Sequence, residues 1–124
     1  MPIEWSDDIT IAELADEPEL SEEFAAIFGR LNAPDGAGGG AGIPHIVLNF
    51  SGVTFLNSSH LAQLLRMRKK LIESGRQLVL CSLGDDLWSV MMLTGLDKVF
   101  RFASDPLTAL AGLQLEQQSQ EDRG

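Results

Sequence analysis

Four consecutive polar residues, Asn57-Ser58-Ser59-His60, carry the side chains of this chain that are best placed to do chemistry. A serine hydroxyl next to an imidazole suggests a nucleophile with its general base. Adjacent residues at the start of a helix seldom point toward each other, however, and the sequence offers no acid to orient His60. We therefore expect no enzymatic activity and interpret His60 as a surface or partner-contact residue.

A short strand and a helix flank these residues. Positions 46–50 form an apolar run that is typical of a buried strand. Asn57, Ser58 and Ser59 are favourable N-cap residues, and a helical pattern follows from Leu61 to Ser74, just before Gly75. Because backbone N–H groups at a helix start attract anions, this turn can hold a phosphate group.

The inward side of the predicted helix consists of apolar residues at helical spacing, namely Leu61, Leu64, Leu65, Leu71 and Ile72. This arrangement places Arg68 near the middle of the inward face. Its aliphatic stem can extend along the sheet edge toward solvent, or its guanidinium can pair with an acid of the N-terminal segment. The sequence leaves both alternatives open.

The charge of the chain is distributed unevenly. The net charge is −9 over 124 residues, and residues 1–35, with ten acids and one base, account for all of it. Nucleic acid is not expected as a partner, because phosphate contacts need clustered Lys and Arg. The acidic segment is either a solvated face or a docking surface for a basic partner.

The composition is that of a globular domain with one core, since 44% of the residues are apolar. No apolar run approaches the roughly 20 residues that cross a bilayer, and no signal peptide opens the chain. The single cysteine, Cys81, lies in an apolar run and reads as a small buried side chain. We expect a cytoplasmic protein with no metal, because no metal-ligand spacing occurs, and with no cofactor.

The remaining elements alternate between strands and helices. A strand at 9–14, with 3–5 as a possible partner, precedes a helix from Leu20 to Leu31. Further strands are predicted at 77–83 and 99–102, with helices at 87–94 and from Pro106 to Leu113. The glycine-rich residues 36–42 follow a helix and contain no lysine, so they are a flexible insertion rather than a phosphate loop. We expect a single α/β domain over 1–113 with a largely parallel sheet, and a flexible tail at 114–124.

Two motifs in this order resemble a known family. The strand ends in Leu48-Asn49-Phe50-Ser51-Gly52-Val53, and Phe55-Leu56-Asn57-Ser58-Ser59-His60-Leu61 follows. Residues 46–100 resemble a STAS domain of bacterial anti-sigma factor antagonists, where Asp-Leu-Ser-Gly-Val leads to Phe-Ile-Asp-Ser-Ser-Gly-Leu. Segments 75–80 and 93–100 match the family's usual strand and helix endings. The resemblance implies a STAS-type sandwich, with a mixed, mostly parallel sheet of 4–5 strands packed by about four helices.

The resemblance also implies a regulatory function. Antagonists of this family bind an anti-sigma factor that is a serine kinase of the histidine-kinase-like ATPase type, and phosphorylation of the turn serine ends the interaction. By position Ser58 is the phosphoacceptor, with Ser59 as the alternate. The implied partner contacts are Asn57, Ser58, Ser59, His60 and Gln63. An alternative is a STAS scaffold that is not phosphorylated and assembles with itself, for example as a homodimer, or with other STAS proteins.

Three positions differ from the family pattern. Asn57 stands where the family has Asp, and His60 stands where it has Gly. The family's Gly-Glu-Leu-Asp near the N-terminus is met only in part, with Asp16 displaced by one position. These differences leave phosphorylation open while the binding fold is expected.

The helix at 87–94 carries a second candidate contact surface. Leu87, Val90, Met91 and Thr94 form its predicted inward stripe. Trp88 and Met92 lie four residues apart on a flank outside that stripe, which is typical of an interface centre. The alternative is that the N-terminal segment covers both side chains.

Overall fold

The computed structural model describes residues 3–4, 9–32 and 43–123, so the glycine-rich segment 36–42 lies outside the described residues. One sheet has five strands in the order β1-β2-β3-β4-β5. β1 (Ile3–Glu4) pairs antiparallel with β2 (Ile9–Ala15), and parallel pairing continues through β3 (His45–Gly52), β4 (Leu78–Cys81) and β5 (Arg101–Ala103). The predicted α/β fold with a mixed, mostly parallel sheet is confirmed.

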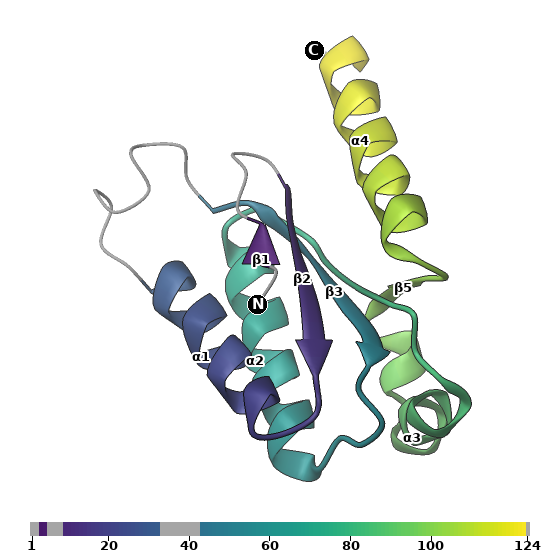
Figure 1. Cartoon of the computed structure of the whole chain (residues 1–124). Coiled ribbons are helices and arrows are strands. Elements are labelled where there is room, and N and C mark those ends of the chain that lie inside the picture. The colour runs from purple at the N-terminus through teal and green to yellow at the C-terminus, as the bar shows by residue number, and fades with distance from the viewer. Residues whose placement is uncertain (1–2, 5–8, 33–42, 124) are drawn as a thin grey trace.

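The helices are α1 (Glu19–Leu31), α2 (Ser58–Glu73), α3 (Asp85–Thr94) and α4 (Pro106–Arg123). A short 3-10 helix, η2 (Leu96–Lys98), links α3 to β5. The alternation of β3 side chains explains the layers, because Ile46, Leu48 and Phe50 pack with α1, α2 and α3. Val47 faces the opposite side of the sheet, where Ala109 and Leu113 of α4 cover it. Figure 1 shows α4 apart from α1 and α2.

The inward face of α2 differs from the predicted one. Its buried residues are His60, Leu64, Met67 and Leu71, whereas Leu65 and Ile72 are exposed. This stripe follows the i, i+4, i+7, i+11 spacing of a helix that begins at Ser58. Met67 therefore lies at the centre of the inward face, where the sequence predicted Arg68. Arg68 is half-buried beside it.

The last helix is longer than predicted. Asp105 caps it, since its Oδ1 accepts the Thr108 N–H at 2.7 Å. The helix then continues past Leu113 to Arg123, and its far half extends beyond the sheet (Figure 1). An ion pair between Glu116 and Arg101 ties the extension to β5. The residues after Leu113 are rich in Gln, Glu and Leu, which are good helix formers, so the helix continues. The lack of an apolar stripe in this part shows only that the helix no longer packs on the sheet.

Candidate functional site

The carboxyl ends of the parallel strands gather three connections at one edge of the molecule. The segment after β2 leads into α1, the one after β3 leads into α2, and the one after β4 leads into α3. Figure 1 shows the arrowheads of β2 and β3 at the end where α2 begins. Functional groups of open parallel sheets collect at this edge, and the predicted site lies here.

The first turn of α2 is held by a reciprocal cap. Asn57 is the N-cap residue, and its Oδ1 accepts the His60 N–H at 2.9 Å. In return, His60 Nδ1 accepts the Asn57 N–H at 3.1 Å. This capping box leaves the hydroxyls of Ser58 and Ser59 exposed on the turn. Gln63, one turn later, donates to Ser59 Oγ at 3.4 Å, so four of the predicted contact residues lie together here with His60 beneath them.

The expectation that His60 lies at the surface is wrong. The residue is only 2% exposed, because it belongs to the stripe that faces the core. Its Nε2 lies 2.7 Å from Glu17 Oε2, and its ring meets the edge of Phe24 at 80°. Glu17 is therefore the orienting acid that the sequence analysis did not find. Both ring nitrogens are bonded, so His60 has no nitrogen left to act as a base for Ser58.

Glu17 is anchored at both of its carboxylate oxygens. Ser21 donates its backbone N–H to Oε1 at 2.9 Å and its hydroxyl to Oε2. The hydrogen bond from the Ser21 hydroxyl, followed by that from His60, lowers the pKa of Glu17 from 4.5 to about 2. The carboxylate is therefore ionised at neutral pH and accepts the Nε2–H of His60.

Asp16 binds the connection between β3 and α2. Its carboxylate accepts the Thr54 N–H at 2.8 Å, the Thr54 hydroxyl at 2.8 Å and the Phe55 N–H at 3.4 Å. The Thr54 backbone and hydroxyl bonds, in that order, lower the pKa of Asp16. The acid that the sequence analysis matched to the family's N-terminal motif thus lies beside the predicted site.

A pocket of about 460 Å³ lies between this connection and the start of α3. Its polar lining is carboxylates and hydroxyls with no cation, so it does not resemble an anion site. Among the described residues, no three His, Cys, Asp or Glu side chains converge as a metal site requires. The lining residues are Phe50, Ser51, Val53, Thr54, Ser82, Gly84, Asp85, Asp86 and Leu87.

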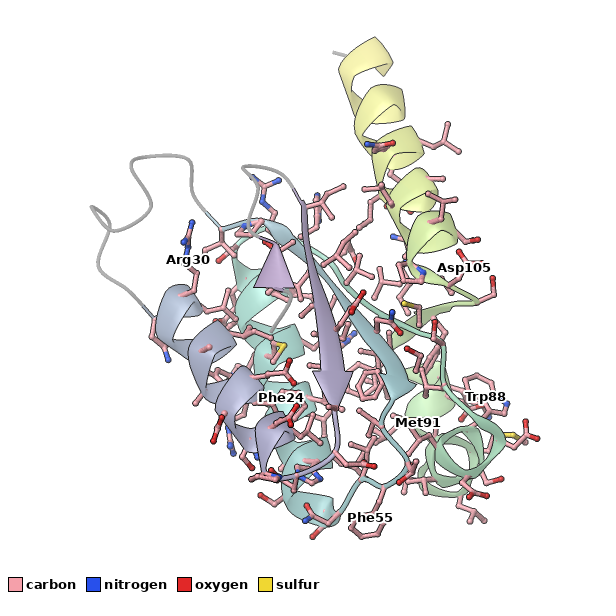
Figure 2. The ribbon with its side chains drawn as sticks, viewed as in Figure 1. Phe24, Arg30, Phe55, Trp88, Met91 and Asp105 are labelled. Carbon is pink, nitrogen blue, oxygen red and sulfur yellow. The ribbon has the colours of Figure 1, made fainter. Side chains whose placement is uncertain are left out.

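The outer face of α3 is apolar. Trp88 is 38% exposed and Met92 is 58% exposed, so no segment that the structure describes buries them. Trp88 also packs edge-on against Phe102, with ring centroids 4.8 Å apart. In the predicted inward stripe, Leu87 and Met91 are buried, whereas Val90 is half-buried and Thr94 is exposed. Figure 2 shows Met91 on the sheet side of α3 and Trp88 on its outer side.

Two exposed apolar residues at this end escaped the sequence analysis. Phe55 is 64% exposed on the connection before α2, and Leu93 is 87% exposed on α3. Phe55 lies between Val53 and Leu56, which are both buried, and an apolar residue among apolar neighbours gives no sign of exposure. Figure 2 places Phe55 and Trp88 apart, so α3 and the connection present separate apolar contacts.

The STAS domain family model matches residues 4–109, and the chain therefore belongs to the STAS domain family. A STAS domain protein of Planctomyces limnophilus, named an anti-sigma-factor antagonist, has a similar fold with a TM-score of 0.72 and 18% identity, covering 91% of this chain and 97% of its own. The crystal structure of a candidate anti-sigma factor antagonist from Thermotoga maritima has a TM-score of 0.72 and 21% sequence identity, and the match covers 91% of this chain and 93% of that one. An NMR structure of the protein TM1081 has a TM-score of 0.70 and 24% sequence identity, and the match covers 91% of this chain and 87% of that one. In the described part of the chain, no helix is long and apolar enough to span a membrane.

Proposed function

We propose that this STAS protein is a cytoplasmic anti-sigma factor antagonist, a regulatory module that binds an anti-sigma factor without catalysing a reaction. Its partner is a serine kinase of the histidine-kinase-like ATPase type. The kinase switches the interaction off by phosphorylating Ser58. The observation that carries the proposal is the exposed Ser58 hydroxyl on the capped first turn of α2, within a fold shared with proteins named as antagonists.

The surroundings of Ser58 support recognition by another protein. Exposed acids lie in and just before the first turn of α1 and in the first turn of α3, and exposed apolar groups lie on the connection and on α3. Such a surface suits a partner that offers both basic and apolar groups. The acids are Glu17, Glu19, Glu22, Asp85 and Asp86, and the apolar groups are Phe55, Trp88 and Met92.

Phosphate at Ser58 changes this surface in a definite way. A phosphoserine adds about −1.5 to −2 charges at neutral pH, and the free N–H groups of a helix start stabilise it. The Asn57 side chain accepts the N–H of His60, the third residue of α2. The N–H groups of Ser58 and Ser59 come before it and are two of the first N–H groups of the helix. The bulk and hydration of the phosphate would then separate surfaces that fit closely in the unmodified protein.

Intact-mass spectrometry after incubation with the kinase and ATP tests the modification. The protein should gain about 80 Da per phosphate, Ser58→Ala should gain nothing, and Ser59→Ala should behave as the wild type. A phosphate that persists in Ser58→Ala, or maps to Ser59, contradicts the assignment of Ser58.

The alternative is a STAS scaffold that assembles with itself or other STAS proteins without phosphorylation. It is favoured by Asn57, because this residue supplies no carboxylate beside the acceptor and its Oδ1 is used by the His60 N–H. Asn57→Asp distinguishes the two functions, since Asp caps as well as Asn and stability should change by less than about 0.5 kcal/mol. Under the antagonist proposal the rate of phosphate transfer to Ser58 rises. An unchanged rate, together with a concentration-dependent dimer in sedimentation, favours the scaffold.

A further inference from the structure

His60 connects two elements through its two ring nitrogens. Nδ1 accepts the Asn57 N–H at 3.1 Å, so in the neutral ring the proton resides on Nε2 and is donated to Glu17 Oε2 at 2.7 Å. The ring also packs on Phe24 of α1, with centroids 6.2 Å apart. One side chain therefore joins the backbone directly before Ser58 to a carboxylate in the turn before α1.

This histidine does more than the usual residue at its position. A Glu or Gln at the third helical position completes a capping box with a single flexible side chain. His60 completes the same box while buried, and its second nitrogen is bonded to Glu17. Glu17 in turn accepts two hydrogen bonds from Ser21 in the first turn of α1. The cap at Asn57 is thus connected to the start of α1.

Asp16 holds the other end of the same connection. It binds Thr54 and Phe55 just after β3, whereas Glu17 acts through His60 on Asn57 just before α2. Adjacent residues of one turn therefore fix the connection at both ends. Ser58 is the first helical residue after this doubly fixed segment.

We propose that His60 is a positioning residue for Ser58: by bonding the Asn57 N–H and Glu17 at once, it sets the backbone direction from which the Ser58 hydroxyl projects. The consequence for phosphate transfer rests on the proposed function. Glu17 is half-exposed, so a basic group of a bound partner can reach its carboxylate. Such contact would compete with His60 and loosen the turn, which makes α1 a second point from which the partner acts on Ser58.

Two substitutions of His60 distinguish the contribution of its ring nitrogens from that of its side-chain volume. His60→Leu keeps an apolar side chain against Phe24 but removes both nitrogens. His60→Gln restores an acceptor for the Asn57 N–H in the manner of a standard capping box. Amide hydrogen exchange by NMR, measured at Asn57 relative to β3, reports the cap without any partner. We expect exchange at Asn57 to be about fivefold faster in His60→Leu and intermediate in His60→Gln, which restores the acceptor for the Asn57 N–H but not the bond to Glu17.

The rate of phosphate transfer to Ser58 by the kinase and ATP should follow the same order, with His60→Gln rescuing part of the loss in His60→Leu. Glu17→Ala should speed exchange at Asn57 while the amides of Thr54 and Phe55, which Asp16 holds, stay protected. Wild-type exchange and transfer rates in His60→Leu would overturn the positioning role. Equal losses in His60→Leu and His60→Gln would reduce His60 to a packing residue, and an unchanged Asn57 amide in Glu17→Ala contradicts the link to α1.

The two proposals fail in different ways. If the kinase leaves the wild-type protein unmodified, the proposed function fails, whereas the amide comparison still decides whether His60 positions the turn. If Ser58 is phosphorylated at equal rates in all His60 variants, the function stands and the positioning role falls.

Discussion

Glu17 links the stability of the fold to pH. Hydrogen bonds from Ser21 and His60 lower its pKa from 4.5 to about 2 in the folded protein. A carboxyl group with a lowered folded pKa stabilises the fold above its unfolded pKa, and this contribution disappears as the pH falls through the folded value. We therefore predict that Glu17→Gln lowers the unfolding free energy at pH 7 and that the difference from the wild type shrinks between pH 4.5 and 2.

Urea unfolding at a series of pH values measures this difference directly. Glu13→Gln is a suitable control, because Glu13 is an exposed acid on β2 whose side chain makes no hydrogen bond to the residues that the structure describes. A constant gap between the wild type and Glu17→Gln across the acid range would show that the ionised carboxylate contributes nothing through these bonds.

The limits of prediction at the residue scale follow from sequence separation. Asn57 was among the three predicted N-cap residues, since a cap binds a group only three residues away. Glu17 and His60 are 43 residues apart, and Asp16 and Thr54 are 38 apart, so no local pattern reveals either contact. His60 was placed at the surface for this reason. A buried polar residue is recognisable only when its partner is known.

At the scale of elements, the end of β3 depends on a glycine. A Cβ added to Gly52 would lie 2.7 Å from the Leu14 carbonyl oxygen, and neither backbone can move cheaply within the pairing of β2 and β3. We predict that Gly52→Ala lowers the unfolding free energy by roughly 1–3 kcal/mol. Gly29→Ala is the matched control, since its Cβ meets nothing within 4 Å. On an exposed helical site it should raise stability by up to about 1 kcal/mol. Denaturant unfolding of both variants measures these changes in unfolding free energy. An unchanged unfolding free energy in Gly52→Ala would refute the predicted clash with Leu14.

The outer face of α3 gives a second prediction at this scale. Trp88 is partly packed on Phe102, so Trp88→Ala should cost roughly 1–2 kcal/mol of stability. If this face also binds the partner, the same substitution should weaken binding by roughly 2 kcal/mol or more. Leu93→Ala, on the most exposed side of the helix, should change stability by less than about 0.5 kcal/mol. A stability loss of roughly 3–5 kcal/mol would make Trp88 a core residue, and unchanged binding would remove α3 from the interface.

The predicted elements were most accurate where periodicity and caps agree. Asn57, one of the three predicted N-cap residues, caps α2, the helix predicted at 87–94 ends where α3 ends, and the strand at 46–50 lies within β3. Errors occurred where only one signal was present. The stripe on α2 was assigned from apolar residues alone, and its phase became clear only with the helix start at Ser58. Residues 99–100 precede β5, because η2 uses part of the link from α3.

At the scale of the whole molecule, the order of the strands brings exposed acids of two helices to one edge. The exposed acids near the start of α1 and α3 flank the edge where Ser58 lies, whereas Arg66 and Lys69 lie further along α2. These acids give the proposed binding edge a local negative charge, which favours approach of a basic partner. The excess of acids in residues 1–35 was visible in the sequence, but the approach of Glu17 and Glu19 to Asp85 and Asp86 at one edge follows from the parallel order of the strands.

The affinity of the anti-sigma kinase for the protein, before and after phosphorylation of Ser58, tests the central claim most directly. Isothermal titration calorimetry should show binding of the unmodified protein and a Kd at least about tenfold larger for the phosphorylated form. Ser58→Ala should bind as the unmodified protein does, because it keeps the surface and cannot receive the phosphate. Equal affinity for both forms, or the absence of binding by the unmodified protein, would contradict a partner switch at Ser58.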